Sequence, residues 1–153
     1  MARDIRRKLE KGNDYIETAA RNIVSRHPDK AELVLLENVP RKQYLEIMRS
    51  CHVLLDQIYS YTPATMALEA MASGLTAISG AEADYYNFIG EKENFPIINA
   101  PYSLEALERC IEDVVLHPGR LHENSIKGRA FVEKHNSMEV VAAKFLNFWK
   151  ANG

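Results

Sequence analysis

The sequence predicts an α/β protein with a Rossmann-like, doubly wound parallel sheet in a single domain. Short apolar runs typical of strands buried on both faces alternate along the chain with segments whose apolar residues recur every three or four positions, as in amphipathic helices. Such alternation indicates parallel βαβ units with right-handed crossovers. The length of 153 residues is that of one domain, and 46% hydrophobic with 26% charged residues excludes a disordered or fibrous chain.

In the first half of the chain, helices are expected at residues 13–26, from Pro40 onward and at 63–73, and strands at 32–36 and 52–56. Residues 13–26 carry one apolar stripe, and a proline suits the first position of a helix. No convincing strand precedes the first helix.

In the second half, strands are expected at residues 75–79 and 95–98, with a helical turn at 84–89 between them. A wholly helical tail follows: a helix capped by Ser103, a second over residues 120–134 and a third capped by Ser137. In the terminal helix, Phe145, Phe148 and Trp149 form a stripe expected to be core.

Charge and cysteine usage restrict the partners and the compartment. The net charge of −2 gives no reason to expect nucleic acid, although residues 1–11 hold five basic against two acidic side chains. Two cysteines without metal-type pairing favour reduced thiols in the cytoplasm. The five histidines lack metal spacing and are expected at surface or loop positions.

Two features could carry chemistry at the carboxyl ends of the predicted strands, where open parallel sheets bind ligands. With Thr62 as cap and Pro63 as first helical residue, the N–H groups of Ala64, Thr65 and Met66 would face an anion; the alternative is an ordinary capped helix. Glu69 is the only charge in its small, apolar helix and could accept hydrogen bonds from ribose hydroxyls. The alternative for Glu69 is a partly exposed or internally paired glutamate.

Three stretches carry a resemblance to a family. They are the run ALEAMASGL at residues 67–75 with the strand and loop before it, the tail from Ser137 to Trp149, and RRKLEKG at residues 6–12. Together they resemble the C-terminal, donor-binding domain of two-domain GT-B retaining glycosyltransferases of group 1 type. The resemblance covers residues 1–153, and implies a fragment of an enzyme whose N-terminal acceptor domain lies outside this chain.

The resemblance also assigns residues around the donor. It places Arg6 and Lys11 at the donor diphosphate, and the amides of Thr65 and Met66 at the same diphosphate and the sugar.

For the nucleoside and the sugar, the resemblance implies that Glu69 holds the ribose and that the backbone of Val39 lies near the base. Tyr61 stands where the family has the first of its paired glutamates, which meets the donor sugar.

The function implied is retaining transfer of a sugar from a UDP- or GDP-sugar to a glycan or lipid-linked acceptor, without a metal or another cofactor. The resemblance also implies a role in polysaccharide biosynthesis in the cytoplasm, with peripheral association of the full enzyme with a membrane. The isolated chain is expected to be inactive without its acceptor domain.

The alternative is a non-catalytic nucleotide-sugar-binding module that has lost transfer activity, for which Tyr61 is the reason. An unrelated flavodoxin-like signalling domain is disfavoured, because no strand end presents an acidic cluster.

Overall fold

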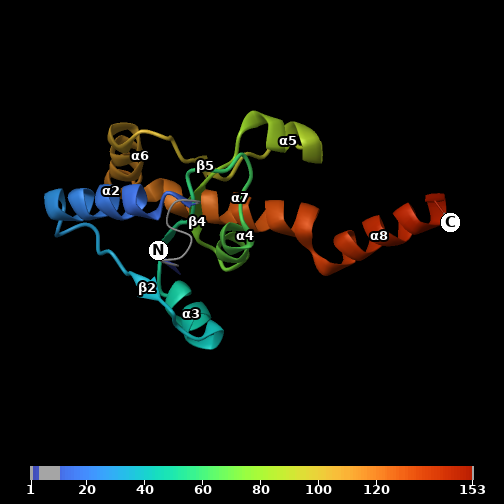
Figure 1. The fold of residues 1–153 in the computed structure, drawn as a ribbon, viewed down its shortest axis with the longest axis horizontal. Coiled ribbons are helices and arrows are strands. Elements are labelled where there is room, and N and C mark those ends of the chain that lie inside the picture. The colour runs from blue at the N-terminus through green and yellow to red at the C-terminus, as the bar shows by residue number, and fades with distance from the viewer. Residues whose placement is uncertain (1, 4–10, 153) are drawn as a thin grey trace.

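A computed structural model describes residues 2–3 and 11–152 of the protein (Figure 1). The strands are β1 (Ala2–Arg3), β2 (Leu36–Glu37), β3 (Val53–Leu55), β4 (Thr76–Ser79) and β5 (Ile98–Asn99). The helices are α2 (Asn13–Arg26), α3 (Arg41–Met48), α4 (Thr65–Ala72), α5 (Ala83–Ile89), α6 (Leu104–Leu116), α7 (Gly119–Asn136) and α8 (Met138–Asn152). This order alternates strand and helix as far as α6 and ends in helices.

All strand pairs in the described residues are parallel. β3, β4 and β5 form a three-stranded sheet in that order, with Val53 opposite Thr76 and Ile78 opposite Ile98. β1 and β2 form a second, two-stranded sheet with Ala2 opposite Leu36. The Rossmann-like α/β architecture with a helical tail is therefore confirmed. The expectation that no strand precedes the first helix is wrong, and β2 is shorter than the predicted 32–36.

Helices cover both faces of the three-stranded sheet (Figure 1). On one face, Ile16 and Ile23 of α2 and Leu107 of α6 pack against Ile78 of β4. On the other face, the neighbouring residue of β4, Ala77, packs in a second cluster that joins α4, α5 and α7. Adjacent residues of one strand thus serve opposite cores, because side chains alternate across a sheet. This explains the continuous apolar run at the strand.

Helix starts were predicted with mixed success. Ser103 caps α6, its side chain accepting a hydrogen bond from the amide of Ala106 at 3.2 Å. The predicted cap at Thr62 and start at Pro63 are wrong, since α4 begins at Thr65 after the extended residue Ala64. Likewise Pro40 is the residue before α3 rather than its first helical residue.

A buried carboxylate, Glu91, anchors α7 to the loop after α5. The carboxylate of Glu91, only 2% exposed, accepts hydrogen bonds at 2.7 Å from Lys134 and His135, and three further ones from backbone amides of residues 92–94. These hydrogen bonds hold the pKa of Glu91 well below its ordinary value of 4.5, and the bond from His135 has the largest effect. The prediction of a surface or loop position is therefore wrong for His135. Its ring is buried and packs at a tilt against Phe131, with the ring centroids 4.8 Å apart.

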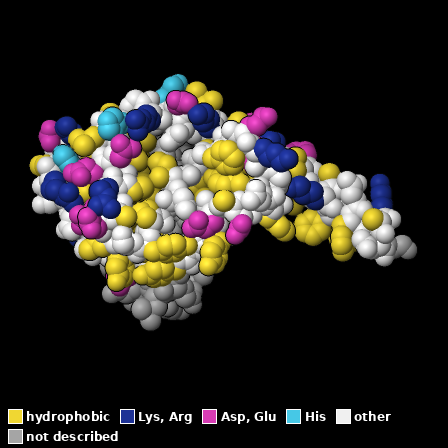
Figure 2. Space-filling model, turned by 90° about the horizontal axis from the view of Figure 1, so that it is seen from above, with side chains coloured by type: hydrophobic (Ala, Val, Ile, Leu, Met, Phe, Trp, Pro, Cys, Tyr) yellow, Lys and Arg dark blue, Asp and Glu magenta, His cyan; other side chains and the backbone are white. Residues whose placement is uncertain are grey.

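The terminal helix α8 contradicts the expectation of a core stripe. It projects from the body of the protein (Figure 1), and hydrophobic side chains line one side of the projecting arm in Figure 2. No residue of α8 is buried. The exposed apolar face of α8 consists of Met138, Val141, Phe145, Leu146, Phe148 and Trp149, which are 37% to 80% exposed. None of the described helices has the length and apolarity that crossing a membrane requires.

Candidate functional site

Polar side chains gather where β3 and β4 end. Asp56 follows β3 directly and Ser79 is the last residue of β4. The hydroxyl of Ser79 donates to Oδ2 of Asp56 at 3.2 Å, and both residues are buried. The carboxyl edge of the sheet, where ligands of this fold class bind, is therefore built around a buried carboxylate.

Lys11 is held at this edge by Asp56. Its Nζ lies 3.1 Å from Oδ1 of Asp56, and the two side chains are 12% and 0% exposed. Among the described residues, this bond to Asp56 uses one of the three N–H groups of the ammonium. Sequence reasoning selected Lys11 but missed Asp56, although a single carboxylate directly after a buried apolar strand is a recognisable signal.

The loop at residues 57–62 ties Lys11 to the approach to α4. The amide of Ile58 donates to the carbonyl of Lys11 at 3.0 Å. Gly12 has a left-handed φ of 69°, and a Cβ there would lie 2.4 Å from Cγ1 of Ile58. A Cβ at Gly80 would lie 1.8 Å from the carbonyl oxygen of Ser60. Both glycines let the backbone close around this loop, which the sequence did not reveal.

The start of α4 offers unpaired backbone donors. The amides of Thr65 and Met66 form no hydrogen bond to another described residue, and no side chain caps this end. The first turn also lacks an acidic residue. Free N–H groups at a helix N-terminus carry a partial positive charge and favour an anion. Two of the three predicted amides, those of Thr65 and Met66, thus have no partner among the described residues, although the cap differs from the prediction.

Glu69 is paired with an arginine that the sequence did not single out. Arg41, at the start of α3, approaches the Glu69 carboxylate with both terminal nitrogens, at 2.6 and 3.4 Å. The Glu69 side chain is 22% exposed and that of Arg41 70%. Val39 and Met66 pack against one hydrophobic cluster close by, between α3 and α4. The structure therefore brings Val39, Met66 and Glu69 into one region.

Tyr44 of α3 is a buried residue of the hydrophobic cluster between α3 and α4. Its hydroxyl is buried and has no hydrogen-bond partner among the described residues. Burial, and then the negative charges of Glu69 and Asp56, raise the pKa of Tyr44 to about 12. The ring of Tyr44 packs with Leu54 of β3 and Ala70 of α4, in the hydrophobic cluster that Val39 and Met66 contact.

Two predicted residues remain. Tyr61 lies on the loop before α4 with 70% of its surface exposed. Arg6 lies outside the described residues. In the part of the chain that the structure describes, no group of three or more His, Cys, Asp or Glu side chains is arranged to hold a metal ion.

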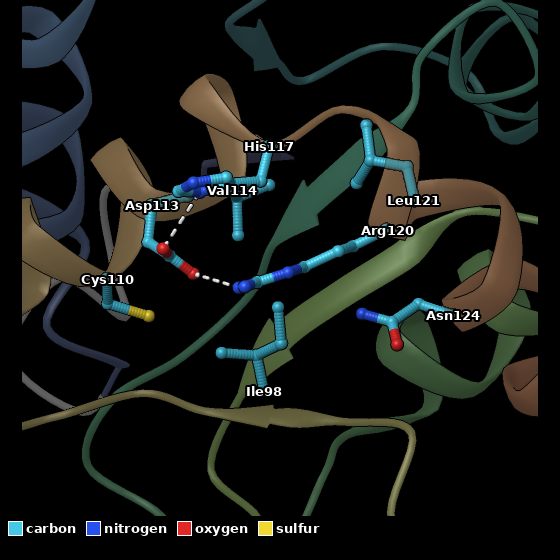
Figure 3. A pocket seen from close by; sticks show the side chains of 8 residues that line it. All are labelled: Ile98, Cys110, Asp113, Val114, His117, Arg120, Leu121 and Asn124. Atoms are coloured by element: carbon cyan, nitrogen blue, oxygen red, sulfur yellow. Dashed lines mark hydrogen bonds and ion pairs between the residues drawn. The ribbon is translucent and has the colours of Figure 1, made fainter.

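A cavity of about 260 Å³ lies elsewhere, between α6, α7 and the start of β5 (Figure 3). Its lining comes from the second half of α6, the turn after it, the start of α7 and Ile98 of β5. Asp113 lies 2.9 Å from the Nδ1 of His117 and 3.1 Å from the Nη1 of Arg120, so the arginine that lines the cavity is already paired. Burial, and then the charge of Asp113, raise the pKa of the Cys110 thiol, which makes it a poor nucleophile. Neither Lys11 nor any residue of α4 lines this cavity.

The fold and the site define a Rossmann-like α/β domain with unpaired donors at its carboxyl edge. The chain belongs to the glycosyl transferase-like family, whose model matches residues 4–147. This membership confirms the resemblance to group 1-type glycosyltransferases and supports glycosyl transfer as the general activity. Neither a curated protein nor a solved structure gave a significant match.

Proposed function

We propose that this chain is the donor-binding domain of a retaining glycosyltransferase and binds the diphosphate of a nucleoside-diphosphate sugar at the carboxyl edge of the sheet. One observation carries the proposal. Asp56 holds Lys11 at this edge, and the loop that contacts Lys11 leads to the unpaired amides of Thr65 and Met66. A fixed cation and a helix N-terminus together form an anion site.

The chemistry of transfer fits such a site. Cleavage of the bond between sugar and diphosphate leaves negative charge on the departing phosphate, which preorganised donors stabilise without a metal. Each tenfold in rate requires about 1.4 kcal/mol, and one helix terminus supplies roughly 0.3 to 2 kcal/mol. Lys11 and the predicted partner Arg6 supply the remainder. Because Asp56 neutralises part of the charge of Lys11, the second cation is important.

The nucleoside lies beside α3 and α4 in this proposal. Glu69 accepts hydrogen bonds from the ribose while it keeps its bond to Arg41, since two carboxylate oxygens offer about four acceptor positions. The backbone of Val39 faces the base, and the donor is a UDP- or GDP-sugar. The sugar passes to a glycan or lipid-linked acceptor in polysaccharide biosynthesis.

A separate acceptor-binding domain completes the enzyme in this proposal. The exposed apolar face of α8 supports it, because a face with six large hydrophobic side chains in contact with water is typical of an interaction surface. The free thiols of Cys51 and Cys110 support a cytoplasmic location.

A second candidate function is a binding module without transfer activity. Tyr61 favours it, because a phenol cannot replace the charge of a carboxylate near the reacting sugar. The two candidate functions share the diphosphate site, so nucleotide binding is expected of both. An assay of sugar transfer distinguishes them.

The test removes one amide donor without removing the helix. Ala64 has φ −83° and ψ 169°, a conformation that favours proline at the next position, and proline suits the first residue of a helix. Thr65→Pro therefore deletes the N–H group of residue 65, and Thr65→Ala is the matched control that keeps it. We expect UDP or GDP to bind the wild type in calorimetry, Thr65→Pro to weaken binding about tenfold, and Thr65→Ala to leave it unchanged. Equal affinity of all three proteins for the nucleotide would contradict the proposal.

A further inference from the structure

Helix α7 holds the C-terminal end of α4, which is the end opposite the unpaired amides (Figure 1). Nη1 of Arg129 donates to the carbonyl of Ala72, the last residue of α4, at 2.6 Å. The last carbonyls of a helix have no partner within that helix, so a donor from another element satisfies this one. A side chain distant in sequence thus fixes the end of α4.

Two neighbours of Arg129 on α7 pack closely against the same helix. A Cβ at Gly128 would lie 3.1 Å from Cγ of Met71, so only a residue without a side chain lets α7 approach α4 this closely. Phe131 is fully buried in the hydrophobic cluster that contains Ala67 and Met71 of α4. The separation of α4 and α7 is therefore set by direct contact.

Both the helix that carries Arg129 and its side chain are held in place. The last turn of α7 is anchored by the bonds from Lys134 and His135 to the buried carboxylate of Glu91. Nε of Arg129 donates to Oε1 of Glu133 at 2.6 Å, which orients the guanidinium. Because Glu133 also balances its charge, Arg129 acts on α4 mainly through geometry rather than through its electric field.

We propose that Arg129 and Gly128 are positioning residues for the diphosphate site, because they set where the amides of Thr65 and Met66 lie. This inference rests on the proposed function, since it requires the diphosphate to bind at the start of α4. α4 has eight residues, which at 1.5 Å per residue makes it only about 12 Å long. A helix this short moves as one body, so a displacement at Ala72 reaches Thr65. Donors at a binding site must be held closely, because small misplacements are costly.

The first test removes the bond to α4 and compares affinities for UDP and GDP by calorimetry on the full chain. We expect Arg129→Ala to weaken nucleotide binding about fivefold. Arg129→Lys should recover part of the affinity, since an ammonium still donates to a carbonyl but lacks the planar fork that also binds Glu133. Lys127→Ala is the matched control, because Lys127 is an exposed cation on the same helix and pairs with Glu123. It should leave the affinity unchanged.

The second test changes the separation of the two helices without touching a charge. Gly128→Ala adds a methyl group against Met71, and we expect it to weaken nucleotide binding about threefold. Alanine also has the higher helix propensity, so the affinity should fall without a matching loss of helix stability. Gly119→Ala is the control on α7, since nothing lies within 4 Å of a Cβ there.

A third comparison separates positioning from general stability. Ile111 is a buried residue of α6 and packs on the opposite face of the sheet from α4. Ile111→Val should lower the melting temperature but leave nucleotide affinity unchanged at a temperature where every variant is folded. Under the same conditions, Arg129→Ala should still bind more weakly than the wild type.

The outcomes distinguish the two proposals. If the wild type binds the nucleotide but Arg129→Ala and Gly128→Ala bind it equally well, the positioning role is refuted and the diphosphate site stands. If Ile111→Val weakens binding as much as Arg129→Ala does, the loss reflects stability alone and the inference is refuted. If the wild type binds neither UDP nor GDP, the proposed function fails and the positioning role with it.

Discussion

The buried ion pair between Lys11 and Asp56 should make Asp56→Asn strongly destabilising. Asp56 accepts from Lys11 at 3.1 Å and from Ser79 at 3.2 Å, one bond to each oxygen. Asparagine has one acceptor oxygen, so one of the two donors loses its partner. Because the side chain of Asp56 is 0% exposed, water cannot reach it to replace the lost bond.

The expected loss follows from that burial. Removal of one member of a buried pair costs about 3 to 5 kcal/mol, whereas an exposed pair contributes roughly 0 to 1 kcal/mol. We expect Asp56→Asn to lower the free energy of unfolding by about 3 kcal/mol, equivalent to a melting temperature about 6 to 12 °C lower. Ser79→Ala, which removes one neutral donor, should cost about 1 kcal/mol.

Urea unfolding at neutral pH measures these differences. A cycle of Lys11→Met, Asp56→Asn and the double variant should show coupling, because each single variant leaves one charged or polar group without its partner. Glu123→Gln, at an exposed pair, should change stability by less than about 0.5 kcal/mol. If Asp56→Asn costs no more than this control, Asp56 does not hold Lys11, and the argument for a fixed cation at the sheet edge is refuted.

Three other experiments test the fold. Glu91→Gln should destabilise the protein by about 3 kcal/mol at neutral pH. Since the pKa of Glu91 is lowered in the folded state, its stabilisation is present above pH 4.5 and is lost as pH falls below that value. Urea unfolding at pH 7 and pH 3 should show a smaller acid loss in the variant than in the wild type. Gly80→Ala should cost about 2 to 3 kcal/mol because its Cβ meets a backbone oxygen, whereas Gly119→Ala, with open space, should be neutral; equal melting temperatures would contradict this. The fluorescence of Trp149, the only tryptophan, should be quenched by acrylamide nearly as readily as free tryptophan; strong protection would show that α8 is covered.

The elements with strong periodicity were predictable from the sequence. Residues 13–26 were predicted as a helix and form α2 with the same bounds, because its apolar stripe packs on the sheet and on α6. Ser103 was also predictable as a cap, because its hydroxyl accepts a hydrogen bond from a backbone amide in the first turn of the helix that follows it. Such local chemistry is visible in sequence.

Features that depend on distant contacts were not predictable. β1 pairs with β2 across more than thirty residues of chain, and nothing local in Ala2–Arg3 indicates a strand. The stripe of α8 has the period of a core helix, but periodicity does not tell which partner covers the face. His135 was expected near the surface, and only the fold brings it to Glu91.

In the candidate site, too, some residues were predictable from the sequence and others were not. Thr65 and Glu69 could be selected from local sequence, and Lys11 from the resemblance of residues 6–12 to the family. Their partners Asp56 and Arg41 come from other elements, and the fold alone joins them.

The most direct test of a diphosphate site at the carboxyl edge is a crystal structure of the full chain with UDP or GDP. The account predicts phosphate oxygens within about 3 Å of Nζ of Lys11 and of the amide of Thr65. A diphosphate bound instead in the cavity between α6 and α7, or anywhere distant from both donors, would contradict it.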